Sequence, residues 1–264
     1  MKIGFIGLGN MARAMIGGML QKEIVGAGDI IGSAKTQKTM DSMKKEFHIE
    51  TFAGNRNVAK QADVIVLAVK PVFFQEVIEE IKDVITEDKL IISIAAGKSL
   101  QWIEDRFGKE IKLIRCMPNT PALVGAGCTA VCSNSKVEKQ DEEFCLKLME
   151  SFGKAMVIPE RLMDAAGAVG GSSPAFVFLF IEAMADGAVK AGMPRKQAYE
   201  FAASAVLGSA KMVLETGMHP GELKDMVCSP GGTTIEGVAV LEEKGMRAAV
   251  MEAIGACVEK SGKL

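Results

Sequence analysis

Short apolar runs alternate with amphipathic stretches over the first 159 residues of the chain. The runs that predict strands are Lys2 to Ile6, Asp29 to Gly32, Ile49 to Phe52, Asp63 to Val69, Lys89 to Ala95, Lys112 to Cys116, Gly127 to Cys132 and Lys154 to Ile158. The stretches with helical spacing extend from the first strand to about Leu20, over Gln37 to Phe47, Asn55 to Gln61 and Phe73 to Ile85, after Ser99, and over Val137 to Phe152. Strands that alternate with helices predict an α/β fold, a mainly parallel, doubly wound Rossmann-type sheet with helices on both faces.

The strand pattern ends near Pro159, and a different pattern follows. Apolar positions three and four residues apart predict helices over Ala165 to Ala191, Arg195 to Glu215 and Thr233 to Glu259, separated by segments rich in Gly and Pro. We therefore predict two domains, a nucleotide-binding domain at residues 1–159 and an all-helical domain at residues 160–264.

Two of the predicted helices, Pro174 to Ala191 and Arg195 to Glu215, carry so many small and apolar residues that little remains for a solvated face. A helix that is apolar nearly all round must be buried. A domain of this size cannot bury both helices at its own centre, so we expect a homodimer formed through the helical domain.

Composition narrows the class of protein. The chain has 264 residues, 48% hydrophobic and 24% charged, with a formal net charge of -2, so it lacks the basic excess of nucleic-acid binders. Its longest apolar runs, such as Val64 to Val69 and Ala175 to Ile181, are shorter than the ~20 residues of a membrane-spanning helix. Glycines and Arg13 interrupt any signal-like apolar start. We expect a cytoplasmic protein with no membrane or nucleic-acid partner.

Cysteine and histidine usage predicts no metal site. The six cysteines include no paired C-x-x-C spacing, and the chain has only two histidines, His48 and His219. We expect free thiols and no structural metal.

The turn after the first predicted strand has the pattern G-x-G-x-x-A. Gly7 permits a tight turn, Gly9 allows close approach of a pyrophosphate, and Ala12 allows the following helix to pack on the strand. The helix N-terminus supplies amide donors for phosphates. The predicted cofactor contacts in this turn are Ile6, Gly7, Leu8, Gly9, Asn10 and Met11.

The second predicted strand indicates which nicotinamide cofactor binds. NAD-binding units place an acidic residue near the end of this strand, but here no acid precedes Asp41. Ser33 and Lys35 suit a 2′-phosphate, so NADPH is favoured, with NADH possible; alternatively, Ser33 and Thr36 cap the next helix. Asn55, after the third strand, either reaches the adenosine or caps a helix.

Two further loops leave strand carboxyl ends, the edge at which such sheets bind ligands. They are Ala68-Val69-Lys70-Pro71 and Ala95-Ala96-Gly97. We expect both to contact the cofactor, and the small residues of the second loop would allow close approach of the nicotinamide.

The segment Ser229-Pro230-Gly231-Gly232-Thr233-Thr234 precedes a helical run. Successive amides and threonine hydroxyls at a helix N-terminus can bind a carboxylate or phosphate, although a capped turn explains the same residues. Gly170 to Pro174 is a similar glycine- and serine-rich segment before a helix, and its proline suits the first helical position.

The chain offers no histidine-carboxylate pair for reduction of a carbonyl, because His48 precedes a strand and His219 heads a turn. Carbonyl reduction requires a general acid for the forming alkoxide. The nitrogen of a cyclic imine is basic enough to arrive partly protonated, so reduction of a C=N bond suits a site of backbone donors and hydroxyls.

Several segments, in order along nearly the whole chain, resemble pyrroline-5-carboxylate reductases. They are Phe5 to Ala12, Ala68 to Pro71, Arg115 to Pro121, Ala183 to Gly187, His219 to Asp225 and Ser229 to Thr234. The last two are the most diagnostic. The chain departs from the family at Ser173, where a glycine is usual; serine is small and caps helices well, so we expect the fold to persist.

The resemblance implies a function and a site. It implies hydride transfer from NADPH, or less readily NADH, to C5 of 1-pyrroline-5-carboxylate, which gives L-proline in the last step of proline biosynthesis. It implies that Ser229, Gly231, Gly232, Thr233 and Thr234 hold the substrate carboxylate, with Thr234 near the ring nitrogen as the expected proton donor or relay. It also implies that Asn119 and Thr120 line the nicotinamide side, and that helical dimers build into a larger ring.

Three alternatives stay open at this point. A β-hydroxyacid dehydrogenase or imine reductase also has a nucleotide-binding domain followed by helices. Such dehydrogenases resemble one another in carrying a catalytic lysine on the first long helix of the helical domain, but Ala165 to Ala185 contains no lysine. A deazaflavin-dependent NADP reductase would share only the N-terminal half. A non-catalytic NADP-binding regulator would have no use for the Ser229 to Thr234 segment.

Overall fold

The computed structural model describes residues 1–263 and divides into two compact units. The first contains Met1–Gly171 and the last residues of the chain from Cys257 onward, and the second contains Ser172–Ala256. The sequence predicts a domain boundary at 159–160, whereas the compact units divide at 171–172. The structural reason is that Met163 is fully buried against one face of the sheet and Asn119 bonds to Gly170, so these residues pack with the first unit.

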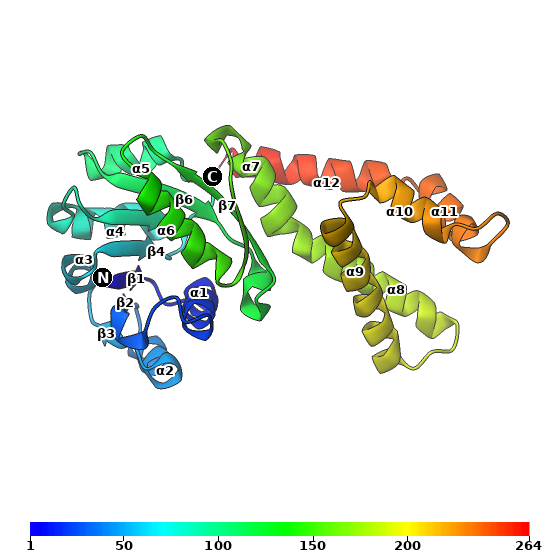
Figure 1. Ribbon diagram of the computed structural model, residues 1–264, viewed down its shortest axis with the longest axis horizontal. Helices are drawn as coiled ribbons and strands as arrows, with labels where there is room; N and C mark the ends of the chain where they lie inside the picture. The colour runs from blue at the N-terminus through cyan, green and yellow to red at the C-terminus, as the bar shows by residue number, and fades with distance from the viewer. Residues whose placement is uncertain (264) are drawn as a thin grey trace. The chain divides into compact units, whose positions relative to one another are not determined.

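The first unit is built on an eight-stranded sheet of order β3-β2-β1-β4-β5-β6-β7-β8 (Figure 1). Its strands are β1 (Ile3–Ile6), β2 (Ile30–Ser33), β3 (Glu50–Phe52), β4 (Val64–Leu67), β5 (Leu90–Ser93), β6 (Lys112–Met117), β7 (Gly127–Ser133) and β8 (Gly153–Val157). All neighbouring pairs are parallel except β6 and β7. The predicted doubly wound α/β fold is confirmed.

Helices cover both faces of this sheet. They are α1 (Asn10–Gln21), α2 (Gln37–Phe47), α3 (Asn55–Gln61), α4 (Phe74–Ile81), α5 (Leu100–Phe107), α6 (Lys139–Glu150) and α7 (Met163–Ala166), with short 3₁₀ turns η1 (Ala27–Asp29), η2 (Pro71–Phe73), η3 (Lys82–Val84), η4 (Thr120–Val124) and η5 (Glu160–Leu162). One core joins the sheet to α1, α2 and α6, and a second joins it to α3, α4, α5 and α7. The central strands β1, β4 and β5 are buried over their whole length, which explains their unbroken apolar runs.

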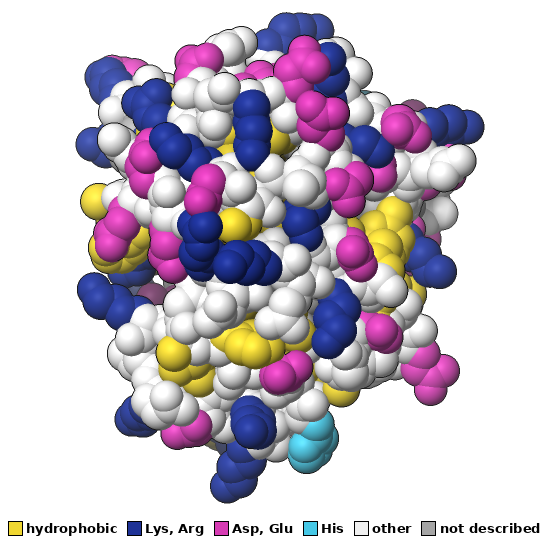
Figure 2. Space-filling view, turned by 90° about the vertical axis from the view of Figure 1, so that its left-hand side faces the viewer, with side chains coloured by type: hydrophobic (Ala, Val, Ile, Leu, Met, Phe, Trp, Pro, Cys, Tyr) yellow, Lys and Arg dark blue, Asp and Glu magenta, His cyan; other side chains and the backbone are white. Residues whose placement is uncertain are grey.

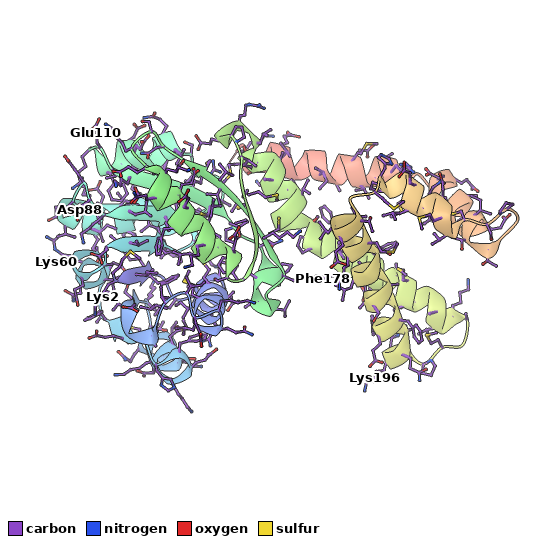
Figure 3. The ribbon with its side chains drawn as sticks, viewed as in Figure 1. Lys2, Lys60, Asp88, Glu110, Phe178 and Lys196 are labelled. Atoms are coloured by element: carbon purple, nitrogen blue, oxygen red, sulfur yellow. The ribbon has the colours of Figure 1, made fainter. Side chains whose placement is uncertain are left out.

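Charged side chains lie at the periphery of this unit, for example Lys60, Asp88 and Glu110 (Figure 3). The outer face seen in Figure 2 intersperses basic and acidic side chains without an extended field of one sign. That distribution agrees with the net charge of -2.

The second unit is entirely helical. It contains α8 (Ser173–Lys190), α9 (Arg195–Thr216), α10 (Pro220–Val227), α11 (Thr233–Glu243) and most of α12 (Met246–Ser261). Helices α8 and α9 pack against each other around the buried residues Ala185, Ala198 and Ala202. An ion pair between Asp186 of α8 and Arg195 of α9 joins the same two helices.

Most large apolar side chains of the helical unit are exposed in the single chain. They include Phe178 (61% exposed), Phe201 (67%), Leu207 (70%) and Met251 (68%). An apolar surface of this extent on a folded unit is typical of an interface between subunits. The observation agrees with the expected dimer.

Three local expectations were wrong in the helical region. The predicted helix Thr233 to Glu259 is broken at Gly245, whose φ of 73° ends one helix before the next begins. His219 does not merely head a turn: its Nδ1 accepts the amide of Gly221 at 3.0 Å and caps α10, which the sequence reading missed. Gly170 to Pro174 is not an exposed anion-binding turn, because Gly167–Ser172 forms a π-helical turn that continues into α8.

The helical run Glu160–Lys190 is long and apolar enough, by length and composition alone, to span a membrane, with a mean hydropathy of 1.5 over its most apolar window. Only uninterrupted apolar runs were compared with the length of a membrane-spanning helix, and Gly170 to Ser173 interrupts the apolar residues of this helical run. Little of that window is buried in the single chain. A dimer interface accounts for the same exposed apolar residues.

Candidate functional site

The carboxyl ends of five parallel strands lie at one edge of the sheet. Register places Ile6 beside Ser33 and beside Leu67, Ser33 beside Phe52, and Leu67 beside Ser93. The loops that follow these strands carry most of the predicted cofactor contacts, so the topology brings those contacts to the edge at which such sheets bind ligands.

The turn after β1 has the geometry that its glycines predict. Gly7 has a φ of 97°, and a Cβ there would lie 2.7 Å from the carbonyl oxygen of Ala68. Gly9 is the N-cap of α1, and a Cβ there would meet no atom within 4 Å. Ala12 is buried against the sheet. The space beside Gly9 and the first amides of α1 together fit a bound pyrophosphate.

At the end of β2, one of the two candidate cofactor-binding residues is buried and the other is exposed. Ser33 is only 1% exposed, and its hydroxyl donates to Oδ1 of Asn55 at 2.8 Å. Lys35 is exposed, with Nζ 5.4 Å from the centre of the Phe73 ring. Thr36 caps α2, because its Oγ1 accepts the amide of Thr39. Lys35 is therefore the exposed cation of this loop, and its ammonium lies over an aromatic ring.

Asn55 is the first residue of α3 and is not its N-cap, which is Gly54. Its Nδ2 donates to Oε2 of Glu80 at 2.6 Å, and its amide donates to Oε1 of the same carboxylate at 3.0 Å. The side chain of Asn55 thus joins β2 to α4 just below the predicted adenosine site.

The loop after β4 is held close to the glycine-rich turn, and the loop after β5 bonds to the end of its own strand. The amide of Ala68 donates to the carbonyl of Ile6 at 2.8 Å, and Lys70 and Pro71 lead into η2. Ala95 is buried, and its amide donates to Oγ of Ser93 at 3.3 Å. Gly97 has a φ of 71°, a backbone conformation that favours glycine.

Asn119 and Thr120 follow β6 but occupy different environments. Asn119 is 8% exposed, its Oδ1 accepts the amide of Cys128 at 2.8 Å, and its Nδ2 donates to the carbonyl of Gly170 at 2.8 Å. Thr120 is exposed at the start of η4. Asn119 therefore connects β7 to the π-helical turn, while Thr120 is free to face a ligand.

The sequence reading missed Arg115, which is buried in β6. Its Nη1 lies 3.1 Å from Glu160 Oε1, its Nη2 lies 4.0 Å from Asp164, and its Nε has no hydrogen-bond partner among residues 1–263. Glu160 also accepts the amide of Leu100 at 2.7 Å, and Asp164 accepts the Ser261 hydroxyl at 2.8 Å. An arginine within an apolar strand, Leu113 to Cys116, was the available signal, because a buried charge requires a partner.

The cysteines are free thiols in the described part of the chain, as expected. Burial raises the pKa of the Cys132 thiol to about 11, and the nearby Glu160 carboxylate raises it in the same direction while Arg115 opposes it. The sulfurs of Cys116 and Cys145 lie 3.6 Å apart in the core, and this contact together with burial raises the pKa of Cys116. These thiols are poor nucleophiles at neutral pH.

In the helical unit, Ser229 to Gly232 forms a loop that leads into the first turn of α11. The amide of Gly232 donates to the carbonyl of Ser229 at 3.0 Å, and Gly231 has a φ of 68°. Gly232 is the N-cap, where no side chain satisfies the first amides of the helix. Thr233 and Thr234 are exposed in the first turn. The loop can therefore present amides and hydroxyls to an anion.

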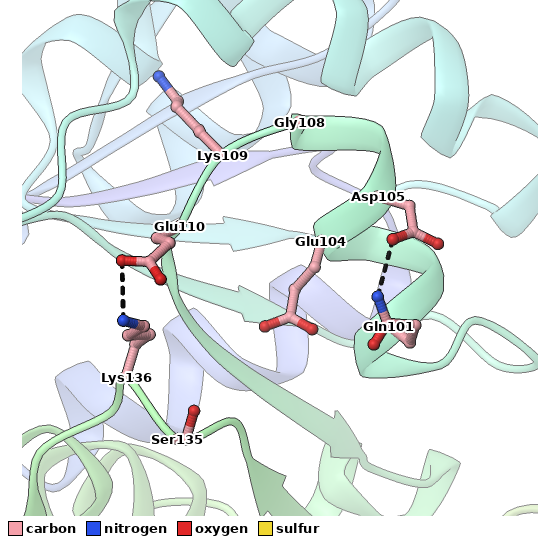
Figure 4. A pocket seen from close by; sticks show the side chains of 8 residues that line it. All are labelled: Gln101, Glu104, Asp105, Gly108, Lys109, Glu110, Ser135 and Lys136. Carbon is pink, nitrogen blue, oxygen red and sulfur yellow. Dashed lines mark hydrogen bonds and ion pairs between the residues drawn. The ribbon is translucent and has the colours of Figure 1, made fainter.

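A pocket of about 500 Å³ lies at the opposite edge of the sheet, near the start of β6 (Figure 4). Its lining residues are Gln101, Glu104, Asp105, Gly108, Lys109, Glu110, Ser135 and Lys136. Most of its charged groups are already paired, as Lys136 is with Glu110 at 2.8 Å and Glu104 with Asn134 at 2.7 Å. This pocket is remote from the predicted cofactor contacts and is not the candidate site.

Residues 1–263 contain no group of three or more His, Cys, Asp or Glu side chains arranged to hold a metal ion. The cationic and backbone groups at the sheet edge instead suit phosphates.

Family models match both parts of the chain. Residues 2–97 match the family described as NADP oxidoreductase coenzyme F420-dependent, and residues 160–264 match pyrroline-5-carboxylate reductase dimerisation. The helical match begins where the sequence analysis placed the second domain.

Relatives and solved structures agree with these matches over the full length. Pyrroline-5-carboxylate reductase of Escherichia coli is 52% identical over 263 residues, which cover 100% of this chain and 98% of the relative. The solved pyrroline-5-carboxylate reductase of Coxiella burnetii superposes with a TM-score of 0.93 at 35% identity, covering 99% of this chain and 97% of that one. The Plasmodium falciparum pyrroline carboxylate reductase with NADP bound has a TM-score of 0.90 at 34% identity, with the same coverage.

Proposed function

The chain belongs to the pyrroline-5-carboxylate reductase family, and from this membership we propose the chemistry of its site. The protein is an NAD(P)H-dependent oxidoreductase that reduces 1-pyrroline-5-carboxylate to L-proline, the last step of proline biosynthesis. The single observation that carries this function is the 52% identity to the Escherichia coli enzyme over the full chain. NADPH is the preferred cofactor, and NADH is a possible substitute.

Bound NADPH supplies a hydride to C5 of the ring, and the ring nitrogen gains a proton, so the C=N bond becomes the CH–NH bond of proline. The chain binds the cofactor along the sheet edge. The turn from Ile6 to Met11 holds the pyrophosphate, Lys35 pairs with the 2′-phosphate, and Ala95 to Gly97 lies close to the nicotinamide.

Ser33 and Asn55 act together on the adenosine side. Because the Ser33 hydroxyl donates to Asn55, the serine fixes the orientation of the amide rather than meeting the phosphate itself. The loop Ala68-Val69-Lys70-Pro71 closes the opposite side of the pyrophosphate. Thr120 faces the nicotinamide. Asn119 holds the loop after β6 in place through its hydrogen bonds to Cys128 and Gly170.

The loop before α11 binds the substrate. Amides of Ser229, Gly231 and Gly232 and the hydroxyls of Thr233 and Thr234 hold the carboxylate at the positive end of the helix dipole. Thr234 is the proton donor or relay to the ring nitrogen. This assignment suits an imine, because no histidine or carboxylate acid is needed for a nitrogen that is already basic.

The protein assembles as a homodimer through the helical unit, and dimers join into a larger ring. The exposed side chains of α8 and α9, including Phe178 and Phe201, support a dimer, because water contact with that much apolar surface is costly. We place the enzyme in the cytoplasm, without membrane or nucleic-acid partners. The domains divide functionally at 159–160.

The function is tested by following NADPH absorbance with purified protein and 1-pyrroline-5-carboxylate. Parallel reactions use 1-pyrroline-2-carboxylate, a β-hydroxy acid with NADP⁺, and no substrate. Fast oxidation with the first substrate alone, with proline as product, is the expected result. Tight NADPH binding without turnover of any substrate would contradict the proposal and favour a regulator.

A further inference from the structure

Phe73 is unusual among the aromatic residues of the first unit. It is 39% exposed, whereas the adjacent Phe74 is fully buried in the core between the sheet and α4. Among the described residues of that unit, Phe73 is the most exposed aromatic side chain. Phe74 anchors the chain in the core, and the turn at Pro71–Phe73, closed by the amide of Phe73 on the Lys70 carbonyl at 2.9 Å, directs its neighbour outward.

The contact between Lys35 and Phe73 joins two loops that follow different strands. Phe73 follows β4, and Lys35 follows β2, while β1 lies between those strands in the sheet. The Lys35 ammonium lies 5.4 Å from the ring centre, a cation–π distance. The contact therefore bridges the carboxyl end of β1, directly beside the glycine-rich turn.

The chemistry of NADPH connects these two side chains. The 2′-phosphate and the adenine are attached to the same ribose. A phosphate held by Lys35 therefore brings the adenine within reach of the ring on which Lys35 now rests. An exposed phenyl ring is a suitable stacking surface for a base, and such stacking tolerates any base because each has a π face.

We propose that Phe73 is the adenine platform of the cofactor site and that Lys35 and Phe73 together form an adenosine clamp. In the free protein Lys35 lies over the ring. When NADPH binds, Lys35 pairs with the 2′-phosphate and the adenine stacks on Phe73. Lys35 then discriminates NADPH from NADH, while Phe73 contributes equally to both cofactors. This inference rests on one part of the proposed function, which is that NADPH is the cofactor.

The test measures binding of cofactor fragments by calorimetry, which needs no turnover. The probes are 5′-AMP, which has the adenine without a 2′-phosphate, and 2′,5′-ADP, which has both. Phe73→Leu is expected to weaken both fragments by about fivefold or more, the lower range of base stacking. Phe73→Tyr keeps a ring and is expected to restore both. Lys35→Met is expected to weaken only 2′,5′-ADP, by about tenfold.

Two matched controls separate the clamp from general damage. Val72→Ala changes the more exposed neighbour of Phe73, and Lys38→Met removes another exposed cation near Lys35; neither is expected to change binding of either fragment. Unchanged affinity of Phe73→Leu for both fragments would overturn the inference. A loss of fragment affinity in Phe73→Tyr as large as that in Phe73→Leu would also overturn it. Turnover of 1-pyrroline-5-carboxylate by the unaltered protein is measured separately, so failure of the clamp is distinguished from failure of the proposed function.

Discussion

Gly7 and Gly9 lie two residues apart in one turn, yet the structure gives them different tasks. A side chain at Gly7 would meet the Ala68 carbonyl in a backbone conformation with a φ of 97°, whereas a side chain at Gly9 would enter open space. Gly7→Ala is expected to cost about 2 kcal/mol of unfolding free energy or more. Gly9→Ala is expected to fold normally and to lose at least about tenfold in NADPH affinity, because its methyl group occupies the place of the pyrophosphate.

Urea unfolding and NADPH titration of the two variants check this pair. Equal stability loss in both would show that the space beside Gly9 is not open. Unchanged NADPH affinity in Gly9→Ala would contradict the assignment of this turn to the pyrophosphate.

Thr234 is the residue to which we assign proton transfer. Thr234→Ala is expected to lower kcat, with a loss that grows to about tenfold or more at high pH, where less substrate arrives already protonated. The pH profiles of kcat and KM for the variant and the unaltered enzyme measure this. A rise in KM alone at every pH would limit Thr234 to binding, and unchanged kinetics at every pH would contradict both roles.

The Cys132 thiol links protonation to stability. Its pKa in the folded protein is about 11, raised from an ordinary value of 9.0, so folding favours the neutral thiol. That contribution is fully present below pH 9, and about 3 kcal/mol of stability is lost as the pH rises from 9 through 11. Cys132→Ala is expected to show a shallower fall in stability between pH 9 and pH 11, measured by urea unfolding. Parallel curves for the two proteins would contradict the raised pKa.

At the scale of elements, two neighbouring residues after β6 have separate roles. Asn119→Ala removes two partly buried hydrogen bonds, to Cys128 and Gly170, and is expected to cost about 2 kcal/mol of stability. Thr120→Ala is the matched change at an exposed position and is expected to leave stability within about 0.5 kcal/mol. Thermal unfolding of both variants distinguishes them, and equal stability in both would refute a structural role for Asn119.

The sequence predicted the elements whose apolar residues follow one clear pattern. It predicted less well the segments that combine a helical pattern with residues typical of turns. The apolar runs of β1, β4 and β5 could only be buried strands of a parallel sheet, and these were found. The helical pattern was predicted to begin at Ala165, yet Gly170 to Pro174 was compared with a turn; the structure has a π-helical turn at Gly167–Ser172, in which Ala168 is buried and Gly170 bonds to Asn119. His219 and Pro220 signalled a turn, yet the same residues cap and begin α10.

The candidate site was predictable to the level of loops and not of atoms. Each loop after a parallel strand must reach the same edge, so Lys35 and Ala68 to Pro71 were predicted to come together. The sequence could not tell that Ser33 turns inward to Asn55 while Lys35 rests on Phe73. Side-chain direction depends on contacts between loops that are distant in the chain. Arg115 was missed for the same reason, since its partners Glu160 and Asp164 lie 45 and 49 residues further along the chain.

At the scale of the whole molecule, the helical unit has too small a core to be stable alone. Three alanines form the buried cluster between α8 and α9, while Phe178, which Figure 3 labels, is 61% exposed. Phe178→Glu is expected to shift the protein from dimers or larger assemblies toward monomers, measured by light scattering after gel filtration. Lys196→Glu, also exposed in this unit, is the control and is expected to leave the assembly unchanged. A monomeric unaltered protein would contradict the dimer.

The account as a whole depends on hydride transfer from NADPH to C5 of the substrate. The most direct measurement uses NADPH with deuterium at both C4 positions and 1-pyrroline-5-carboxylate, with the product analysed by mass spectrometry and NMR. We expect L-proline that carries one deuterium, bonded to C5. Unlabelled proline, deuterium at another carbon, or consumption of NADPH without proline would contradict it.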